Sequence, residues 1–434
     1  MSSFTSIDLF AGCGGLTRGL EDAGFKCLAF NELNKDAAAS FSANFNKAQM
    51  LSNDIYNVTR KELKAKLGDK YKSIDLVCGG PPCQGFSGIG HRRSFSVEKE
   101  DIPTNHLYEE MIRVIKSIRP KAFLFENVRG LLSSKWNSEG ENGEIFRQVY
   151  EAFKSIPGYR VQPTLIHASW FGVPQNRPRV MIMGLREEIF DAAGITLPEF
   201  DLDRKASTFP SQLRNNGGMF PVWDGKHTAP GVEEMISDLA YKITDWYAEK
   251  GIHRMKARNS LQRSMREDLE VVSGKQKLTD HFVSNHSDKV RERFQYMIDN
   301  NIRNIRDLPE KKRTKKFSQK LLPREWENGA PTITCCSNSD DYVHYSIPRA
   351  LSVREWARLQ TFPDHHEFRG PRTTGGVRRA GNPDEGNWDR EVPKYTQIGN
   401  AVPPLLAKAI GEKILEHLTR GQKGAENQDQ QGPL

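Results

Sequence analysis

The stretch Ile74-Asp75-Leu76-Val77-Cys78-Gly79-Gly80-Pro81-Pro82-Cys83-Gln84-Gly85-Phe86-Ser87 decides the fold that we expect for this chain. Its first five residues form a short apolar run, which predicts a buried parallel strand. The two prolines cannot lead such a strand directly into a helix, because proline lacks the backbone donor and fixes φ. Cys83 is therefore predicted to lie on a stiff loop at the carboxyl end of a strand, where open α/β sheets bind their ligands.

Cys83 itself has two interpretations. A cysteine is most often a small buried apolar residue, whereas a nucleophilic cysteine must be a thiolate in a partly exposed, electropositive setting. Two prolines before Cys83 and a Gln-Gly-Phe-Ser turn after it are unusual around a core residue and favour the nucleophile. A zinc deaminase would need a second cysteine three positions later, where this chain has Phe86.

The composition is that of a soluble intracellular protein. A chain of 434 residues predicts two domains, or one large domain with insertions. None of its six cysteines has C-x-x-C or zinc-ligand spacing, and free thiols suit a reducing compartment. We see neither a secretion leader nor an apolar run long enough to span a membrane. These features predict a cytoplasmic protein.

The basic charge is concentrated in one segment. The chain has 63 Lys and Arg against 55 Asp and Glu, a net charge of +8. Residues 251–330 hold 19 Lys and Arg against 11 Asp and Glu, so this segment accounts for the whole excess. It includes Lys311-Lys312-Arg313-Thr314-Lys315-Lys316. Such a run is either a solvated surface or a contact with a phosphate backbone.

The N-terminus predicts a nucleotide-binding unit. Residues 6–10 form an expected strand, residues 11–15 a glycine loop, residues 16–23 a helix ended by Gly24, and residues 26–30 a second strand that ends at Asn31-Glu32. A carboxylate about 20 residues after such a loop can reach ribose hydroxyls. Thr17 replaces the last glycine of G-x-G-x-x-G, which argues against a pyrophosphate cofactor such as NAD and favours S-adenosylmethionine. The alternative is a purely structural turn.

Two further carboxylates follow expected strands. Asp54 could accept a hydrogen bond from an adenine amino group, or it could cap the following helix. Glu126 comes directly after the apolar run 121–125 and should share a sheet edge with Cys83. A thiolate beside a carboxyl group that can be protonated is a chemical pair, in which one group attacks and the other delivers a proton.

The segment Gln175-Asn176-Arg177-Pro178-Arg179 alternates, which predicts that Gln175, Arg177 and Arg179 share one face of an extended segment. Two guanidinium groups on one face suit a carbonyl oxygen, a phosphate or a carboxylate. The alternative is a strand with surface ion pairs.

The regular pattern of expected strands and helices becomes weaker at about residue 190 and is clear again from about residue 346. Ser352 and Glu355 then form an expected capping box. Residues 370–394 are rich in Gly, Arg and Pro and are expected to form a loop. We therefore divide the chain into one domain made of residues 1–189 and 346–420, a second made of residues 190–345, and a disordered polar tail at 421–434.

The chain resembles the cytosine-5 DNA methyltransferases of the bacterial modification type. Eight motifs occur in the order of that family and organise residues 1–185 and 346–415. They are Asp8-Leu9-Phe10-Ala11-Gly12-Cys13-Gly14-Gly15, Asn31-Glu32, Asp54, Pro81-Pro82-Cys83-Gln84, Glu126-Asn127-Val128, Gln175-x-Arg177-x-Arg179, Arg354-Glu355-x-x-Arg358-Leu359-Gln360 and Gly399-Asn400-Ala401-Val402.

The resemblance implies an α/β fold with a doubly wound, mostly parallel sheet that binds S-adenosyl-L-methionine. Residues 1–189 and 346–420 would form the catalytic domain, with the last helix packed beside the first. Residues 190–345 would be the target-recognition domain, with double-stranded DNA in the cleft between the two. It also implies a monomer that is the modification half of a restriction-modification system, with any cognate endonuclease acting separately.

The resemblance also implies a mechanism. Cys83 would add to carbon 6 of a flipped cytosine, Glu126 would hold the ring nitrogen at position 3, and Arg177 and Arg179 would engage the carbonyl oxygen of the base. No metal is implied. The implied cofactor residues are Phe10, Gly12, Gly14, Glu32, Asp54, Ile55, Pro82, Leu107, Asn400 and Ala401, and the implied DNA contacts are Gln84, Ser87, Thr332 and Thr334.

Three rival functions remain to be compared. A transfer-RNA cytosine-5 methyltransferase of the same fold usually has a shorter recognition segment than the roughly 155 residues here. A catalytically inactive DNA-binding relative is disfavoured because Cys83, Glu126 and Arg177 are intact. An NAD-dependent oxidoreductase would need the glycine that Thr17 replaces. The motifs favour the DNA methyltransferase.

Overall fold

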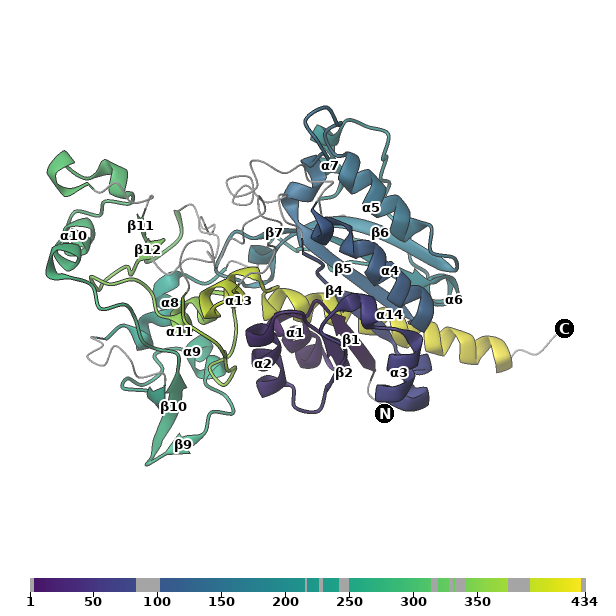
Figure 1. Ribbon diagram of the computed structural model, residues 1–434, viewed down its shortest axis with the longest axis horizontal. Helices are drawn as coiled ribbons and strands as arrows, with labels where there is room; N and C mark the ends of the chain where they lie inside the picture. Colours follow the sequence, from purple (N-terminus) through teal and green to yellow (C-terminus); the bar gives the residue numbers. More distant parts are fainter. Residues whose placement is uncertain are drawn as a thin grey trace.

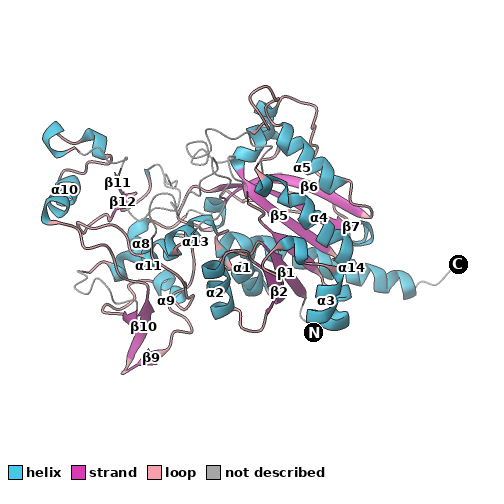
Figure 2. Cartoon of the chain, viewed as in Figure 1, coloured by secondary structure: helices cyan, strands magenta, loops and turns pink. Residues whose placement is uncertain are grey.

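The computed structural model describes residues 4–82, 102–214, 217–225, 229–241, 250–313, 319–327, 331, 341–373 and 391–430. Its main body is built on a seven-stranded sheet, with α-helices on both faces (Figures 1 and 2). The strands of this sheet are β1 (Thr5–Leu9), β2 (Lys26–Asn31), β3 (Gln49–Met50), β4 (Leu76–Gly79), β5 (Ala122–Val128), β6 (Tyr159–His167) and β7 (Pro178–Arg186).

The strand order is β3-β2-β1-β4-β5-β7-β6, and β7 is antiparallel to both of its neighbours. The chain builds outward from β1 to β3 in one direction and then from β4 onward in the other. The carboxyl ends of β1 and β4 therefore form a topological switch point, which is where doubly wound sheets bind ligands. The predicted doubly wound, mostly parallel α/β fold is confirmed.

Two apolar layers cover the sheet. On one face, α4 and α5 pack against alternate residues of β4 to β7, such as Val77, Phe125 and Ile182. On the other face, α1 and α14 pack against the opposite set, such as Cys78, Leu124 and Met181. The helices of this body are α1 (Gly15–Ala23), α2 (Lys35–Asn44), α3 (Arg60–Leu67), α4 (Leu107–Ile118), α5 (Glu144–Lys154), α6 (Glu187–Ala192), α7 (Phe209–Gln212) and α14 (Pro404–Gln430).

The two ends of the chain meet at α1 and α14. A Cβ atom on Gly19 would lie 2.2 Å from the carbonyl oxygen of Pro404, and one on Gly411 would lie 2.8 Å from the Cβ of Ala23. Only glycine allows backbones to approach this closely. The last helix thus packs beside the first, as the resemblance implied.

The remaining described elements lie to the left of the sheet in Figure 1. We call residues 229–343 the outer lobe. Part of its core contains α8 residues such as Met235 and continues into Trp356 and Tyr395, whereas a second small core is built around Phe294 and Leu308. The elements of the outer lobe are α8 (Val232–Ile236), α9 (Ser260–Met265), α10 (Asp288–Asp299), β8 (Lys250–Ile252), β9 (Val271–Val272), β10 (Lys275–Thr279), β11 (Lys320–Leu321) and β12 (Tyr342–Val343), and two helices that follow it are α11 (Val353–Leu359) and α13 (Lys394–Asn400).

The structure differs from the expected divisions at two places. Residues beyond 190 still pack on the sheet, because Phe209 joins one apolar layer and Phe220 joins the other. The tail expected to be disordered from 421 instead continues α14 as far as Gln430, since several of its residues, including Ala, Glu, Gln and Lys, are good helix formers. Among the described residues, no helix is long and apolar enough to cross a membrane.

Candidate active site

The loop after β1 is held in an unusual backbone conformation. Phe10 has φ 55° and Gly12 has φ 56°, both in the left-handed region. A bulky residue rarely adopts this conformation, and the ring of Phe10 packs against the apolar layer under α4. A Cβ atom on Gly12 would meet no atom within 4 Å, whereas one on Gly14 would collide with the ring of Phe45 at 2.3 Å. Gly12 therefore borders open space, and Gly14 allows close packing.

Glu32 lies at the carboxyl end of β2, next to this loop. Its carboxylate accepts hydrogen bonds from the backbone N–H of Gly12 and of Asn34, both at 2.8 Å. Burial raises the pKa of Glu32, and the two N–H donors oppose that rise. The carboxylate is thus fixed beside the open space at Gly12, where it can accept hydrogen bonds from ligand hydroxyls.

Asp54 and Ile55 lie on the loop after β3, which side chains from other elements hold in place. Asn31 donates to the carbonyl oxygens of Ser52 and Asn53, at 2.6 and 2.8 Å. Arg113 on α4 donates to the carbonyl oxygen of Ile55 at 2.8 Å. Asp54 is exposed and caps the short helix that follows, as the alternative interpretation predicted, and Ile55 is buried.

The other predicted cofactor residues lie around the same switch point. Leu107 begins α4 and packs against the layer that contains Phe10. Pro82 is exposed and borders a small cavity below the end of β4. Ala401 lies 3.0 Å from the position of a Cβ atom on Gly15, which places the segment after α13 against the glycine loop. Asn400 is exposed at the end of α13.

Glu126 is placed at the end of β5 and forms an ion pair. Its Oε1 lies 2.5 Å from Nε of Arg179 on the neighbouring strand β7, and both side chains are about nine-tenths buried. A Cβ atom on Gly80 would lie 2.7 Å from Oε2 of Glu126. The carboxylate thus lies against the backbone three residues before Cys83, because β4 and β5 are adjacent and parallel.

Gln175, Arg177 and Arg179 are all buried, whereas Asn176 between them is exposed, which agrees with the predicted alternation. The strand β7 begins only at Pro178, so Gln175 and Arg177 precede it, and each side chain has a different partner. Gln175 donates to the carbonyl oxygen of Leu359 at 3.0 Å, and Nη2 of Arg177 donates to the carbonyl oxygen of Gly399 at 2.6 Å.

Five predicted site residues lie outside the described residues: Cys83, Gln84, Ser87, Thr332 and Thr334. The structure adds one residue that sequence reasoning did not give a role. Asn127 donates from Nδ2 to the carbonyl oxygen of Pro81 at 3.3 Å and so connects the end of β5 to the start of the Cys83 loop. Its place directly after Glu126 was the available signal.

A buried carboxyl group supports the glycine loop from below. Asp8 on β1 accepts a hydrogen bond from Oγ1 of Thr17 at 2.6 Å. Burial raises the pKa of Asp8 from an ordinary 3.8 to about 7, although the Thr17 hydroxyl opposes the rise. The folded protein therefore holds a proton that the unfolded chain releases between these two pH values.

Stability should therefore depend on the charge of Asp8. Between about pH 4 and pH 7, rising pH lowers the free energy of unfolding, by an amount on the order of 4 kcal/mol at most. We expect Asp8→Asn to remove this part of the pH dependence, while Asp22→Asn at an exposed site keeps it. Urea unfolding of the three proteins across this range measures the difference, and parallel curves for wild type and Asp8→Asn would contradict the prediction.

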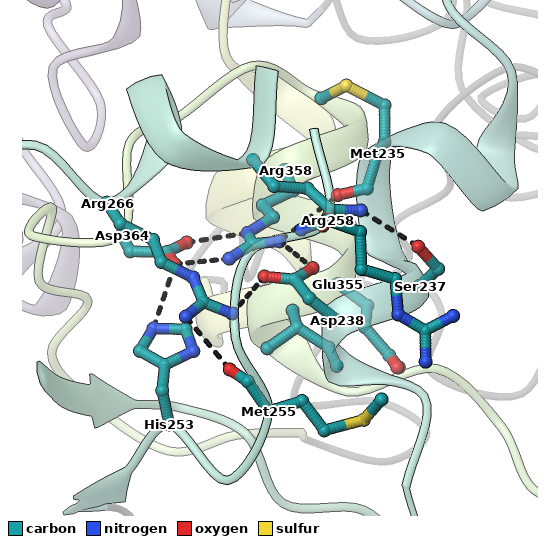
Figure 3. A network of polar contacts seen from close by, with 12 residues as sticks. Met235, Ser237, Asp238, His253, Met255, Arg258, Arg266, Glu355, Arg358 and Asp364 are labelled. Atoms are coloured by element: carbon teal, nitrogen blue, oxygen red, sulfur yellow. Dashed lines mark hydrogen bonds and ion pairs between the residues drawn. The ribbon is translucent and has the colours of Figure 1, made fainter. Parts of the chain in front are cut away.

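A buried network of ion pairs joins α11 to the outer lobe (Figure 3). Arg358 makes a bidentate contact with Asp364 at 2.8 and 2.6 Å, and it donates to Asp238 at 2.5 Å. Asp238 also pairs with Arg266, and His253 lies 3.2 Å from Asp364. Burial alone would raise the pKa of Asp364, but the Arg358 guanidinium holds it well below its usual range.

A second buried group fixes the start of α11. Arg349 makes a bidentate contact with Glu355 at 2.7 and 2.6 Å, and the predicted capping box between Ser352 and Glu355 is present. Burial lowers the pKa of the adjacent His281 and His344 to about 3, so both are neutral near pH 7. The charged residues of α11 therefore serve to hold the two parts of the molecule together.

The loop that begins at residue 370 contributes one described arginine. Arg372 lies over the ring of Phe282 at 5.3 Å and donates to the hydroxyl of Ser284 at 3.1 Å. Its side chain is thus directed at the outer lobe. Arg378 and Arg379, which belong to the same loop, lie outside the described residues.

Comparison of the sequence with known proteins identifies the family to which the chain belongs. Residues 4–416 match the model of the C-5 cytosine-specific DNA methylases. The chain is 30% identical over 417 residues to the type II methyltransferase M.DdeI of Desulfomicrobium norvegicum, covering 94% of this chain and 88% of that protein. It is also 30% identical over 415 residues to M1.HphI of Haemophilus parahaemolyticus, covering 95% and 87%.

The fold is shared with a solved structure described as a DNA modification methyltransferase encoded within an E. coli prophage. The TM-score is 0.65 at 21% identity, and the match covers 96% of this chain and all of the other. At 21% identity, this match shows that the two proteins share a fold and shows nothing beyond the fold.

Proposed function

The chain belongs to the C-5 cytosine-specific DNA methylase family, and from this membership we propose that it methylates carbon 5 of one cytosine within a short, specific DNA sequence. The observation that carries the proposal is the buried Glu126–Arg179 pair at the end of β5, which lies against Gly80 at the start of the Cys83 loop. This arrangement brings a carboxylate, a guanidinium and the nucleophile's loop to one sheet edge.

The residues at the switch point fit S-adenosyl-L-methionine. Open space at Gly12 lies beside the fixed carboxylate of Glu32, which suits ribose hydroxyls. The exposed carboxylate of Asp54 suits an adenine amino group, and Phe10 and Ile55 supply apolar surface for the ring. Pro82, Leu107, Asn400 and Ala401 would border the rest of the cofactor, and Gly12 and Gly14 would let the loop approach it. When bound, the cofactor supplies an electrophilic methyl group on a sulfonium.

The protein must activate the cytosine, because carbon 5 of the ring is a poor nucleophile. The Cys83 thiolate would add to carbon 6, which turns carbon 5 into an enamine carbon. Glu126 would hold the ring nitrogen at position 3 and share a proton with it as charge develops. Arg179 would fix the Glu126 carboxylate and engage the carbonyl oxygen of the base. Arg177, through Gly399, would hold the segment after α13 against the site. Once carbon 5 has taken the methyl group, loss of its proton restores the ring double bond and expels Cys83.

The outer lobe is well placed to be the target-recognition domain. It contains the whole of the basic segment 251–330, and the chain before it still packs on the sheet as far as Phe220. DNA would lie between the lobe and the carboxyl edge of the sheet, with the base extruded toward Glu126. Gln84 and Ser87 would contact the DNA around the flipped base, and Thr332 and Thr334 would contribute to target contacts.

The names of the relatives extend the proposal to a biological role. M.DdeI and M1.HphI are both called type II methyltransferases, so we propose that this chain is the modification enzyme of a restriction-modification system in a bacterial cytoplasm. It would act as a monomer, because one catalytic domain methylates one strand at a time. A cognate endonuclease would act separately on the same sequence.

Glutamine at position 126 should slow methyl transfer by roughly 10²- to 10³-fold, because an amide cannot share a proton with the ring nitrogen. DNA binding should be retained. The Glu126→Asp variant keeps the carboxylate but shortens the side chain, which weakens the ion pair with Arg179. Its activity therefore shows how much of the loss in Glu126→Gln comes from the ion pair and how much from the carboxylate itself. Single-turnover methyl transfer measures the effect, and Glu151→Gln on α5 is the control. Activity of Glu126→Gln within about twofold of wild type would contradict the proposed role.

Transfer of labelled methyl from S-adenosyl-L-methionine to bacterial genomic DNA tests the function as a whole. We expect 5-methylcytosine as the product base by mass spectrometry, and bisulfite sequencing should locate it in one short motif. Label in transfer RNA but not in DNA would support the rival RNA enzyme. Label in neither would support a DNA-binding protein without activity.

A further inference from the structure

A group of cations and aromatic rings lies at the same sheet edge as Glu126, on the side of β6. Val128, Arg179 and Ile166 are opposite one another across β5, β7 and β6. Arg129 directly follows Val128, and His167 directly follows Ile166. Arg214 lies beyond β6, because it forms a bridge with Leu165. Arg129 and Arg214 thus lie on either side of the ends of these strands. Because β7 lies between β5 and β6, those two strands are about two strand spacings, or roughly 10 Å, apart.

The two arginines are exposed and have no carboxylate partner among the described residues. Neither makes an ion pair or a side-chain hydrogen bond with the part of the chain that the structure describes. Other exposed arginines of the same body do, such as Arg160 with Glu187 at 3.7 Å and Arg204 with Asp201 at 3.2 Å. Burial lowers the pKa of His167, the hydrogen bond with Asn176 opposes this, and the charges of Arg129 and Arg214 lower the pKa further, in agreement with the position of both arginines at this sheet edge.

Aromatic rings pack beside the two arginines at this sheet edge. His167 packs against Trp170 with a centroid distance of 4.8 Å, and Trp170 stacks on Trp223 at 5.6 Å with an angle of 7° between the rings. His167 is also held by Asn176 at 3.2 Å. Trp223 comes shortly after Phe220 and before α8, so the stack lies where the chain leaves the sheet for the outer lobe.

We propose that Arg129 and Arg214, supported by the stack of His167, Trp170 and Trp223, bind phosphates of the DNA strand next to the flipped cytosine. The proposal rests on the proposed DNA methyltransferase function. Unneutralised guanidinium groups at a sheet edge suit phosphate oxygens. Because β5 and β6 lie roughly 10 Å apart and one DNA strand rises 3.4 Å per nucleotide, the two arginines would contact phosphates about three nucleotides apart. The site positions the DNA and does not read its sequence.

The double variant Arg129→Gln, Arg214→Gln tests the proposal. Binding of a duplex with the methylated sequence, and of an unrelated duplex, is measured by fluorescence anisotropy at several KCl concentrations. Loss of two phosphate contacts should reduce the slope of log K against log [KCl] by roughly 1.8 and weaken both duplexes alike. The turnover rate at saturating DNA and the affinity for S-adenosyl-L-methionine should stay unchanged. Trp170→Leu should weaken binding without changing the slope, because it removes no charge.

The control is Arg160→Gln, Arg204→Gln, which removes two exposed arginines that already pair with carboxylates, and its salt slope should equal that of wild type. A salt slope of wild-type size in the Arg129, Arg214 double variant would overturn the proposal. So would a fall in turnover at saturating DNA with unchanged DNA affinity, since that pattern indicates a structural role. Wild-type methylation of DNA is measured in parallel, so failure of the proposed function is seen separately.

Discussion

Alanine in place of Cys83 should abolish methyl transfer to DNA while DNA binding is retained. Without the thiolate, carbon 5 of the cytosine is not activated, and removal of an enzyme's nucleophile costs at least about 10³-fold in turnover. The loss should exceed that of Glu126→Gln, because the glutamate assists a step that the cysteine makes possible. Single-turnover transfer of labelled methyl measures activity, and anisotropy with the same duplex measures binding.

Cys27→Ala is the matched control for this experiment. The Cys27 thiol is buried on β2, and burial raises its pKa, so it is not available as a thiolate. It should keep activity close to wild type. If Cys83→Ala still turned over at more than a few per cent of the wild-type rate, the covalent mechanism would be wrong, whatever the fate of the proposed target.

Methionine in place of Arg358 should destabilise the protein by roughly 3–5 kcal/mol. The substitution keeps an unbranched side chain in place of the aliphatic part of arginine but leaves Asp238 and Asp364 buried without their shared cation, and breaking a buried pair on one side costs about this much. Both carboxylates are fully buried, so water cannot replace the lost contacts. Thermal and urea unfolding measure the effect.

Arg324→Met provides the comparison, because Arg324 pairs with Glu233 at an exposed site and such pairs contribute at most about 1 kcal/mol. Adding Asp364→Asn to Arg358→Met should recover part of the loss, since it removes one unpaired buried charge. Equal stability of the Arg358→Met and Arg324→Met variants would show that the network does not hold α11 to the outer lobe.

The fold could be predicted well wherever local patterns decide it. The expected helix 16–23 and its end at Gly24 differ from α1 by one residue, and the capping box at Ser352 is present. The antiparallel direction of β7 was not predicted, because an apolar strand reads the same in either direction. The helix at 421–430 was also missed, since a polar composition without an apolar face suggests disorder.

The candidate site was predictable to the extent that its residues follow strands. Glu32 and Glu126 come directly after apolar runs, and parallel strands bring such residues to one edge of the sheet. The partners of Gln175 and Arg177 were not predictable, because they lie on α11 and α13, about 180 and 220 residues away. The same reason hides the network of Arg358, whose two carboxylates come from different parts of the chain and show no local pattern.

Trapping on DNA that contains 5-fluorocytosine tests the central claim most directly. Fluorine at carbon 5 cannot leave as the proton does, so a cysteine bonded to carbon 6 stays attached after methyl transfer. With S-adenosyl-L-methionine present, we predict a complex that survives denaturation and a modified peptide that maps to Cys83. The Cys83→Ala variant should form none. A wild-type protein that methylates cytosine but forms no such complex, or forms it at another residue, would contradict the account.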